Sequence, residues 1–219
     1  MKKVSKSALV NSPTELTTAV TDVVLAVLAL LCSLTVLDTG QTAPWKADLW
    51  GGAFGLLALS GVLGAIAHGF KMPGTASRWL WHALYLILGL IVGLFVVGVI
   101  YDGWGETAAR WSLPVMVSTS LIFFSVTLLK PDTFVVFIVY ETAAMIFALV
   151  VYGSLTFWQT LDGAGLMTLG ILITLVAGAV QATKTLSFTL IWPFDHNGLY
   201  HLLQMAGIIF LTAGLWAGF

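Results

Sequence analysis

Seven long apolar stretches, separated by short connections that carry polar residues, proline or glycine, dominate this sequence. They cover residues 15–37, 49–70, 78–101, 108–129, 132–153, 163–185 and 196–218. Each holds about 20 residues or more, which is enough for an α-helix to cross the hydrocarbon core of a bilayer. The sequence therefore predicts an all-α polytopic membrane protein in which residues 1–219 form a single bundle of seven transmembrane helices.

The composition excludes a soluble domain. Of the 219 residues, 59% are apolar and only 9% are charged, too few to cover a water-exposed surface. The net charge of −1 offers no basic surface for nucleic acid, so no nucleic-acid partner is expected. The expected partner is membrane lipid, and other membrane proteins or a second copy of the chain are further candidates.

The positive-inside rule predicts the orientation of the bundle. Alternating spans bring most Lys and Arg residues to the amino-terminal side and only Lys46 and Arg110 to the other. The amino-terminal set is Lys2, Lys3, Lys6, Lys71, Arg78, Lys130 and Lys184. We therefore expect the amino terminus inside and the carboxyl terminus outside. The first span is too long for a removable signal and favours a bacterial inner membrane, with the endoplasmic reticulum as the alternative.

The four histidines fall at the same end of the predicted bundle. His68 ends the second span, His82 opens the third, and His196 and His201 open the seventh. Because neighbouring spans run in opposite directions, all four should lie at one depth near the inner face. The alternative is a set of interfacial histidines that bind lipid headgroups and neighbouring side chains.

Carboxylates inside a span are costly and are candidate functional groups. Asp22 lies about two turns into the first span and Glu141 about 13 Å into the fifth, so each needs a partner inside the bundle, where the histidines are nearest by depth. Asp195 precedes the seventh span and is either catalytic or a helix cap. Glu15 is interpreted as a capping residue, and four acids are interpreted as solvated charges at the outer face: Asp48, Asp102, Glu106 and Asp162.

Imidazoles and carboxylates in a dry pocket are suitable ligands for zinc. The candidate metal ligands are His68, His82, His196 and His201, and the candidate catalytic acids are Asp22, Glu141 and Asp195. Zinc would lower the pKa of a bound water and supply hydroxide beside the lipid. The pattern thus favours a zinc-dependent hydrolase that cleaves an amide or ester in a lipid.

This pattern resembles the CREST superfamily of seven-span membrane hydrolases. The residues that carry the resemblance are His68 in the second span, a polar residue at the start of the third, and the segment Phe194–His201, FDHNGLYH, at the start of the seventh. The superfamily includes alkaline ceramidases, progestin and adipoQ receptors and hemolysin-III-like proteins. The resemblance implies a zinc-dependent lipid amidase or esterase with one histidine ligand from the second helix and two from the seventh.

The sequence departs from the CREST pattern at three positions. Gly64 stands where the superfamily has a serine four residues before the histidine, and His82 stands at best for an aspartate. His196 and His201 are five residues apart instead of four, about 140° around a regular helix. These departures indicate a divergent member of the superfamily, and His196 can join His201 only from the irregular entrance of the helix.

Non-enzymatic functions form the second class of hypotheses. Asp22, Glu141 and the histidines could form a proton or cation relay in a receptor-like or transport protein. The chain could also be a structural subunit of a larger membrane complex. Metal content and lipid hydrolysis distinguish the enzyme from the relay, which should instead carry a pH-dependent flux.

Overall fold

A computed structural model describes residues 10–129, 134–183, 186–189 and 191–219. Its elements in chain order are α1 (Pro13–Thr39), the short 3₁₀ helix η2 (Gly40–Thr42), α2 (Pro44–Gly69), α3 (Gly74–Trp104), α4 (Glu106–Leu129), α5 (Phe134–Phe157), α6 (Ala164–Thr183), strands β1 (Phe188–Thr189) and β2 (Pro193–Phe194), and α7 (His196–Ala217). Lys2, Lys3, Lys6, Lys130 and Lys184, used above for the orientation, lie outside the described residues.

The prediction of seven spanning helices is confirmed. Across the described ranges, seven helices are long and apolar enough to cross a membrane, so the chain is an integral membrane protein. The helices extend past several predicted limits, and α2 begins at Pro44, which suits a first helical position because proline has no N–H to donate. The turn from α3 into α4 needs only Gly105, whose φ of 85° favours glycine.

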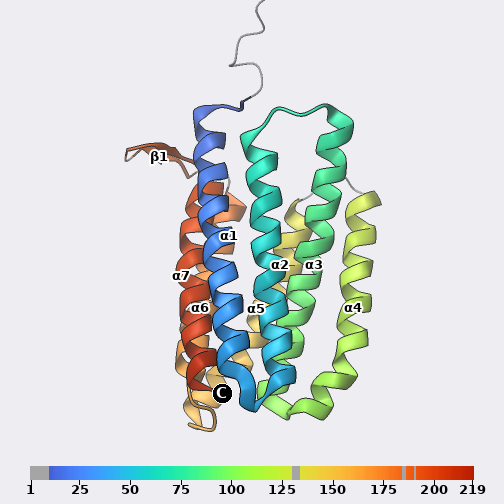
Figure 1. The fold of residues 1–219 in the computed structure, drawn as a ribbon, viewed down its shortest axis with the longest axis vertical. Coiled ribbons are helices and arrows are strands. Elements are labelled where there is room, and N and C mark those ends of the chain that lie inside the picture. The colour runs from blue at the N-terminus through green and yellow to red at the C-terminus, as the bar shows by residue number, and fades with distance from the viewer. Residues whose placement is uncertain (1–9, 130–133, 184–185, 190) are drawn as a thin grey trace, which may run out of the picture.

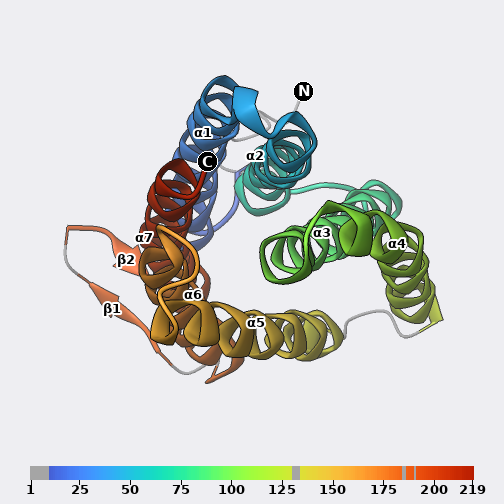
Figure 2. The ribbon, with the colours of Figure 1, turned by 90° about the horizontal axis from the view of Figure 1, so that it is seen from below.

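The helices run up and down (Figure 1). Seen from the end, they follow an arc in the order α3, α2, α1, α7, α6 and α5 (Figure 2). α1 packs most extensively on α2, α6 on α7, and α3 on α4. α4 lies at the edge of the bundle, where it contacts α3 closely and α5 only slightly. One end of the bundle therefore collects the amino termini of α1, α3 and α7 with the carboxyl termini of α2 and α6.

The surface is apolar, as expected for a protein surrounded by lipid. One face of α1 exposes only aliphatic side chains at Val20, Val23, Val27, Leu30 and Leu34. Exposed tryptophans mark the two ends of the bundle, a pattern typical of the membrane interfaces. Trp79 and Trp192 lie at the end with the amino termini of α3 and α7, and Trp104, Trp111, Trp158 and Trp216 lie at the opposite end.

The predicted solvent exposure of Asp102 is wrong. Its Oδ1 forms an ion pair with Lys46 Nζ at 2.7 Å, and the side chains are only 3% and 4% exposed. Tyr152 donates a hydrogen bond to Asp102 Oδ2 at 2.6 Å, and Lys46 donates to the Gly218 carbonyl at 3.1 Å. These contacts join α2, α3, α5 and the carboxyl terminus at the end of the bundle farthest from the histidines.

A short hairpin precedes α7. β1 and β2 pair antiparallel, with Phe188 opposite Phe194, and the two rings stack at a centroid distance of 5.1 Å. Asp195 follows directly as the N-cap of α7. The hairpin and the cap together define where α7 starts, and therefore where His196 and His201 lie.

Candidate functional site

A cavity of about 960 Å³ lies at the end of the bundle where α1, α3 and α7 begin. All four histidines line it, together with Asp22. The other residues in its wall with polar side-chain atoms are Ser60, Ser77, Arg78, Trp81, Tyr85, Thr127, Gln181, Asn197, Tyr200 and Gln204. We call it the histidine cavity. It brings together side chains from helices that are far apart in the sequence.

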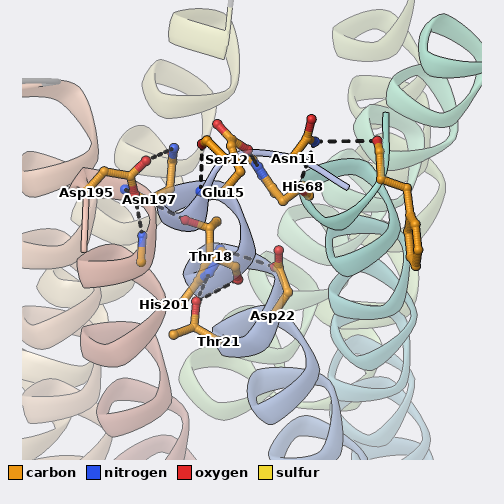
Figure 3. Close-up of polar contacts among 12 residues, drawn as sticks. Asn11, Ser12, Glu15, Thr18, Thr21, Asp22, His68, Asp195, Asn197 and His201 are labelled. Carbon is orange, nitrogen blue, oxygen red and sulfur yellow. Dashed lines mark hydrogen bonds and ion pairs between the residues drawn. The ribbon is translucent and has the colours of Figure 1, made fainter. Parts of the chain in front are cut away.

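The segment before α1 is fixed to the end of α2. Asn11 donates a hydrogen bond from Nδ2 to the His68 carbonyl at 2.8 Å, and Ser12 caps α1 by accepting the Glu15 N–H at 3.4 Å (Figure 3). The sequence indicated that the Glu15 carboxylate caps α1. In the structure this carboxylate instead contacts His68, with Oε2 2.7 Å from His68 Nδ1. Glu15 therefore orients the His68 ring through Nδ1.

His201 lies between Thr21 and Asp22, as Figure 3 shows. Thr21 Oγ1 is 2.9 Å from His201 Nδ1, and Asp22 Oδ1 is 3.3 Å from His201 Nε2. All three residues are at least nine-tenths buried. Asp22 Oδ2 is buried and has no hydrogen-bond partner among the described residues. The pairing of Asp22 with a histidine agrees with the depth argument from the sequence.

The hydrogen-bond geometry places one proton between Asp22 and His201. The Thr21 hydroxyl has a single proton and two acceptors in reach, the Thr18 carbonyl at 2.8 Å and His201 Nδ1 at 2.9 Å. If Thr21 donates to the carbonyl, Nδ1 carries a proton, and the close contact of Nε2 with Oδ1 needs a proton of its own. If Thr21 donates to Nδ1, the proton of the neutral ring is on Nε2. When the shared proton is on Nε2, Asp22 is a carboxylate and its Oδ2 can accept another proton.

The structure places Asp195 at the helix cap. Its Oδ1 accepts the backbone N–H groups of Asn197 at 2.9 Å and Gly198 at 3.0 Å, and it also accepts the Thr18 hydroxyl at 3.2 Å. Burial opposes ionisation of the carboxyl, but the hydrogen bond from the Gly198 backbone and those from neighbouring side chains lower the pKa of Asp195 below its usual value. Asp195 is not in the wall of the histidine cavity, but it accepts hydrogen bonds from Asn197, which is in that wall.

Glu141 lines a second, smaller cavity of about 60 Å³ deeper in the bundle. The expectation of a histidine partner is wrong for Glu141, since the contact found is with Tyr200, whose hydroxyl is 3.5 Å from Oε1. Tyr200 and Gln204 line both cavities. Sequence reasoning overlooked Thr21 and Tyr200, although each directly precedes a residue that it had selected, Asp22 and His201.

Within residues 10–129, 134–183, 186–189 and 191–219, no group of three or more His, Cys, Asp and Glu side chains is arranged to hold a metal ion. Both ring nitrogens of His201 have partners, and Nδ1 of His68 contacts Glu15. The residue types around the cavity suit zinc, but the arrangement of these described side chains does not form a zinc site. To bind a metal, His201 would have to break its contact with Thr21 at Nδ1 or with Asp22 at Nε2.

Comparison with known protein families assigns the chain. The profile of a family of unknown function, DUF6962, matches residues 17–218. The chain belongs to the DUF6962 family. Neither the curated proteins nor the solved structures yield a match. The DUF6962 match runs from the first turns of α1 through α7 and includes Asp22 and all four histidines, so the histidine cavity lies within the family domain.

Gly64 gives the Asp22 carboxylate its place in this DUF6962 chain. A Cβ added to Gly64 would lie 2.7 Å from Asp22 Oδ1 and 2.9 Å from Asp22 Cγ and Oδ2. Gly64 is the position where the CREST pattern has a serine. In this chain the absence of a side chain at Gly64 leaves space for the Asp22 carboxylate from α1. A serine at this position would clash with that carboxylate.

Gly64→Ala is expected to lower the free energy of unfolding by about 1–3 kcal/mol, because the methyl group must displace the Asp22 carboxylate in a closely packed contact. The matched control is Gly52→Ala in the same helix, where the new Cβ would meet only Leu94 Cδ1 at 3.7 Å. Thermal unfolding of both variants in detergent measures the difference. Equal stability of the two variants would contradict the close contact between Gly64 and Asp22.

Proposed function

We propose that the chain is a membrane-embedded hydrolase that cleaves an amide or ester bond in a lipid whose head group enters the histidine cavity. The observation that supports this proposal is the Asp22–His201 pair, a buried acid–base pair in the wall of a large cavity. Acid–base pairs held by hydrogen bonds in a pocket are candidates for proton transfer to and from a substrate.

The walls of the histidine cavity match an amphiphile. Its polar residues are accompanied by aliphatic and aromatic side chains, which include Leu25, Leu57, Leu84, Leu88, Phe134 and Phe137. Its volume of about 960 Å³ lies in the range of small-molecule sites. A lipid head group can contact the polar residues while the first part of its acyl chain packs on the apolar ones.

In the proposed reaction, Asp22 Oδ2 accepts a proton from water, and the water oxygen attacks the acyl carbon of the substrate. The bond from the acyl carbon to nitrogen or oxygen then breaks, and the proton passes from Asp22 to the leaving amine or alcohol. His201 holds Asp22 through Nε2, and Thr21 holds the His201 ring through Nδ1. The products are a fatty acid and the released head group.

Zinc enters the proposal through the residue types in the cavity wall and through the CREST resemblance. Its candidate ligands are His68, His82, His196 and His201, all in the cavity wall. When bound, zinc would supply an acidified water and polarise the acyl carbonyl. The proton transfer assigned to Asp22 does not depend on it.

The experiment that tests the proposal uses purified protein in liposomes that contain lipids with a labelled acyl chain in amide or ester linkage. Release of labelled fatty acid in proportion to the amount of protein is the expected result. The same preparation is analysed for metal, and the zinc hypothesis predicts about one zinc per chain that is lost in His68→Ala. If no lipid of either linkage is hydrolysed, the proposal is wrong.

A proton relay is the second candidate function, and Glu141 is the observation that favours it. This carboxylate lies in the first half of α5 beside Tyr200, which lines both cavities. An intramembrane acid next to a hydroxyl that reaches a polar cavity is typical of proton pathways. A relay predicts pH-driven proton flux into liposomes without hydrolysis, and Glu141→Gln should abolish that flux.

The orientation and location of the chain also belong to the proposal. Of the described Lys and Arg residues, Lys71 and Arg78 lie at the end with the histidine cavity and Lys46 and Arg110 at the other, so these four show no charge bias. The proposed orientation rests on the positive-inside rule applied to the whole sequence. We propose a bacterial inner membrane with the cavity near the cytoplasmic face. Membrane lipid is the proposed partner, and a role as a subunit of a membrane complex is the remaining alternative if neither hydrolysis nor flux is found.

A further inference from the structure

We infer that the histidine cavity selects a neutral amphiphile whose head group carries two or more hydrogen-bond donors, such as a monoester of glycerol. As a statement about substrate this inference rests on the proposed function, but as a statement about binding it can be tested without any turnover. It follows from which polar atoms the cavity residues leave without partners.

A chain of hydrogen bonds fixes the amide of Gln181. Asn197 Nδ2 donates to Asp195 Oδ2 at 3.3 Å, so Asn197 Oδ1 faces the other way and accepts Gln181 Nε2 at 2.7 Å. Gln181 can meet that acceptor only with its NH₂ group. Its carbonyl oxygen Oε1 is consequently the free end of the amide, and it is buried without a partner among the described residues.

Other cavity residues also leave buried polar atoms unpaired. Asp22 Oδ2 and Gln204 Oε1 have no partner in the described part of the chain, and the same holds for His82 Nδ1, which is an acceptor in the tautomer protonated on Nε2. Asp22, Gln181 and Gln204 are each more than nine-tenths buried, and all four residues line the cavity. A buried acceptor without a donor is unfavourable, so a bound head group that supplies hydroxyl or amide protons is stabilised here.

Charge argues against an anionic head group at these acceptors. Among the residues that line the cavity, Asp22 and Arg78 carry formal charges, and Arg78 is exposed at the start of α3. A phosphate near Gln181 and Asp22 would bring only acceptor oxygens to acceptor oxygens, and its charge would repel the carboxylate. Hydroxyl groups, by contrast, donate to these atoms and add no charge.

The test compares three probes with the same acyl chain: a 1-monoacylglycerol, the fatty acid methyl ester, which has no donor, and phosphatidic acid. Binding to the purified protein is titrated by native mass spectrometry at low temperature. The monoacylglycerol is expected to bind at least about tenfold more tightly than the methyl ester, since it alone can satisfy several unpaired acceptors. Equal binding of these two probes, or tighter binding of phosphatidic acid, would overturn the inference.

Variants assign the selectivity to the oriented amide. Gln181→Met removes the acceptor with little change in volume and should bring monoacylglycerol binding down to that of the methyl ester. Asn197→Ala keeps Gln181 but frees its amide, and should cause a partial loss. Gln41→Met is the matched control, because Gln41 is exposed at the opposite end of the bundle, where it donates to the Leu37 carbonyl.

Unchanged selectivity in a folded Gln181→Met protein would overturn the role of the amide. If Gln181→Met does not fold, Asn197→Ala alone decides the question. Unchanged selectivity in Asn197→Ala would show that the hydrogen bonds that orient the Gln181 amide do not determine selectivity, and would overturn its role. Selective binding without release of fatty acid would leave the inference intact and overturn the hydrolase. Hydrolysis of methyl esters as fast as monoacylglycerols would support the hydrolase and overturn the inferred selection of the head group.

Discussion

Lys46→Met is expected to lower the free energy of unfolding by about 3–5 kcal/mol, because it leaves the Asp102 carboxylate buried without its cation. Lys46 also donates to the Gly218 carbonyl, and its ammonium lies 4.9 Å from the centre of the Phe219 ring. The substitution therefore also loosens the carboxyl terminus. Thermal unfolding in detergent, followed by tryptophan fluorescence, measures the loss.

The second ion pair at the same end of the bundle provides the control. Arg110 and Glu106 are also 2.7 Å apart, but their side chains are 55% and 45% exposed, so Arg110→Met should change stability by about 0.5 kcal/mol or less. The double variant Lys46→Met/Asp102→Leu should recover part of the loss, since it removes both buried charges. If Lys46→Met is as stable as Arg110→Met, Asp102 finds another partner and the ion pair is not structural.

The Lys46–Asp102 ion pair shows where hydropathy reasoning fails. A window over apolar residues ended the third span at 101 and started the second at 49, because charged residues are costly in lipid. In the folded chain, Lys46 and Asp102 form an ion pair, which lowers the free-energy cost of burying either charge. α2 therefore extends over Lys46 and α3 over Asp102. Their pairing joins residues far apart in the sequence. The sequence offered one signal, opposite charges at the same predicted depth of neighbouring antiparallel helices.

The location of the site was more predictable than its contacts. Helix direction alone brings His68, His82, His196 and His201 to one end, and all four line one cavity. The pairing of Asp22 with His201 instead depends on Gly64, since a side chain there would fill the place of the carboxylate. Spacing within one helix cannot reveal that. His196 and His201 both line the cavity, although α7 begins at His196 and the two residues are about 140° apart around a regular helix.

Asp22→Asn is expected to lower the rate of lipid hydrolysis by about 10²–10⁴-fold, the loss typical of removing a general base. An asparagine amide fits the space of the carboxylate beside Gly64, and its Nδ2 can donate to His201 Nε2. The fold should therefore persist, and stability should stay the same or rise because a buried ionisable group has been removed. Release of labelled fatty acid and thermal unfolding are measured on the same preparation.

Asp38→Asn in the same helix is the matched control, because Asp38 is exposed near the opposite end of α1 and should be neutral in both measurements. The two readouts for Asp22→Asn separate its roles. A slow but stable variant identifies Asp22 as the base. A variant that keeps its rate shows that another group moves the proton, and one that loses rate and stability together shows that Asp22 acts by positioning His201. In this chain, therefore, the carboxylate that is costly to bury is expected to matter for the reaction and not for the fold, the reverse of Asp102.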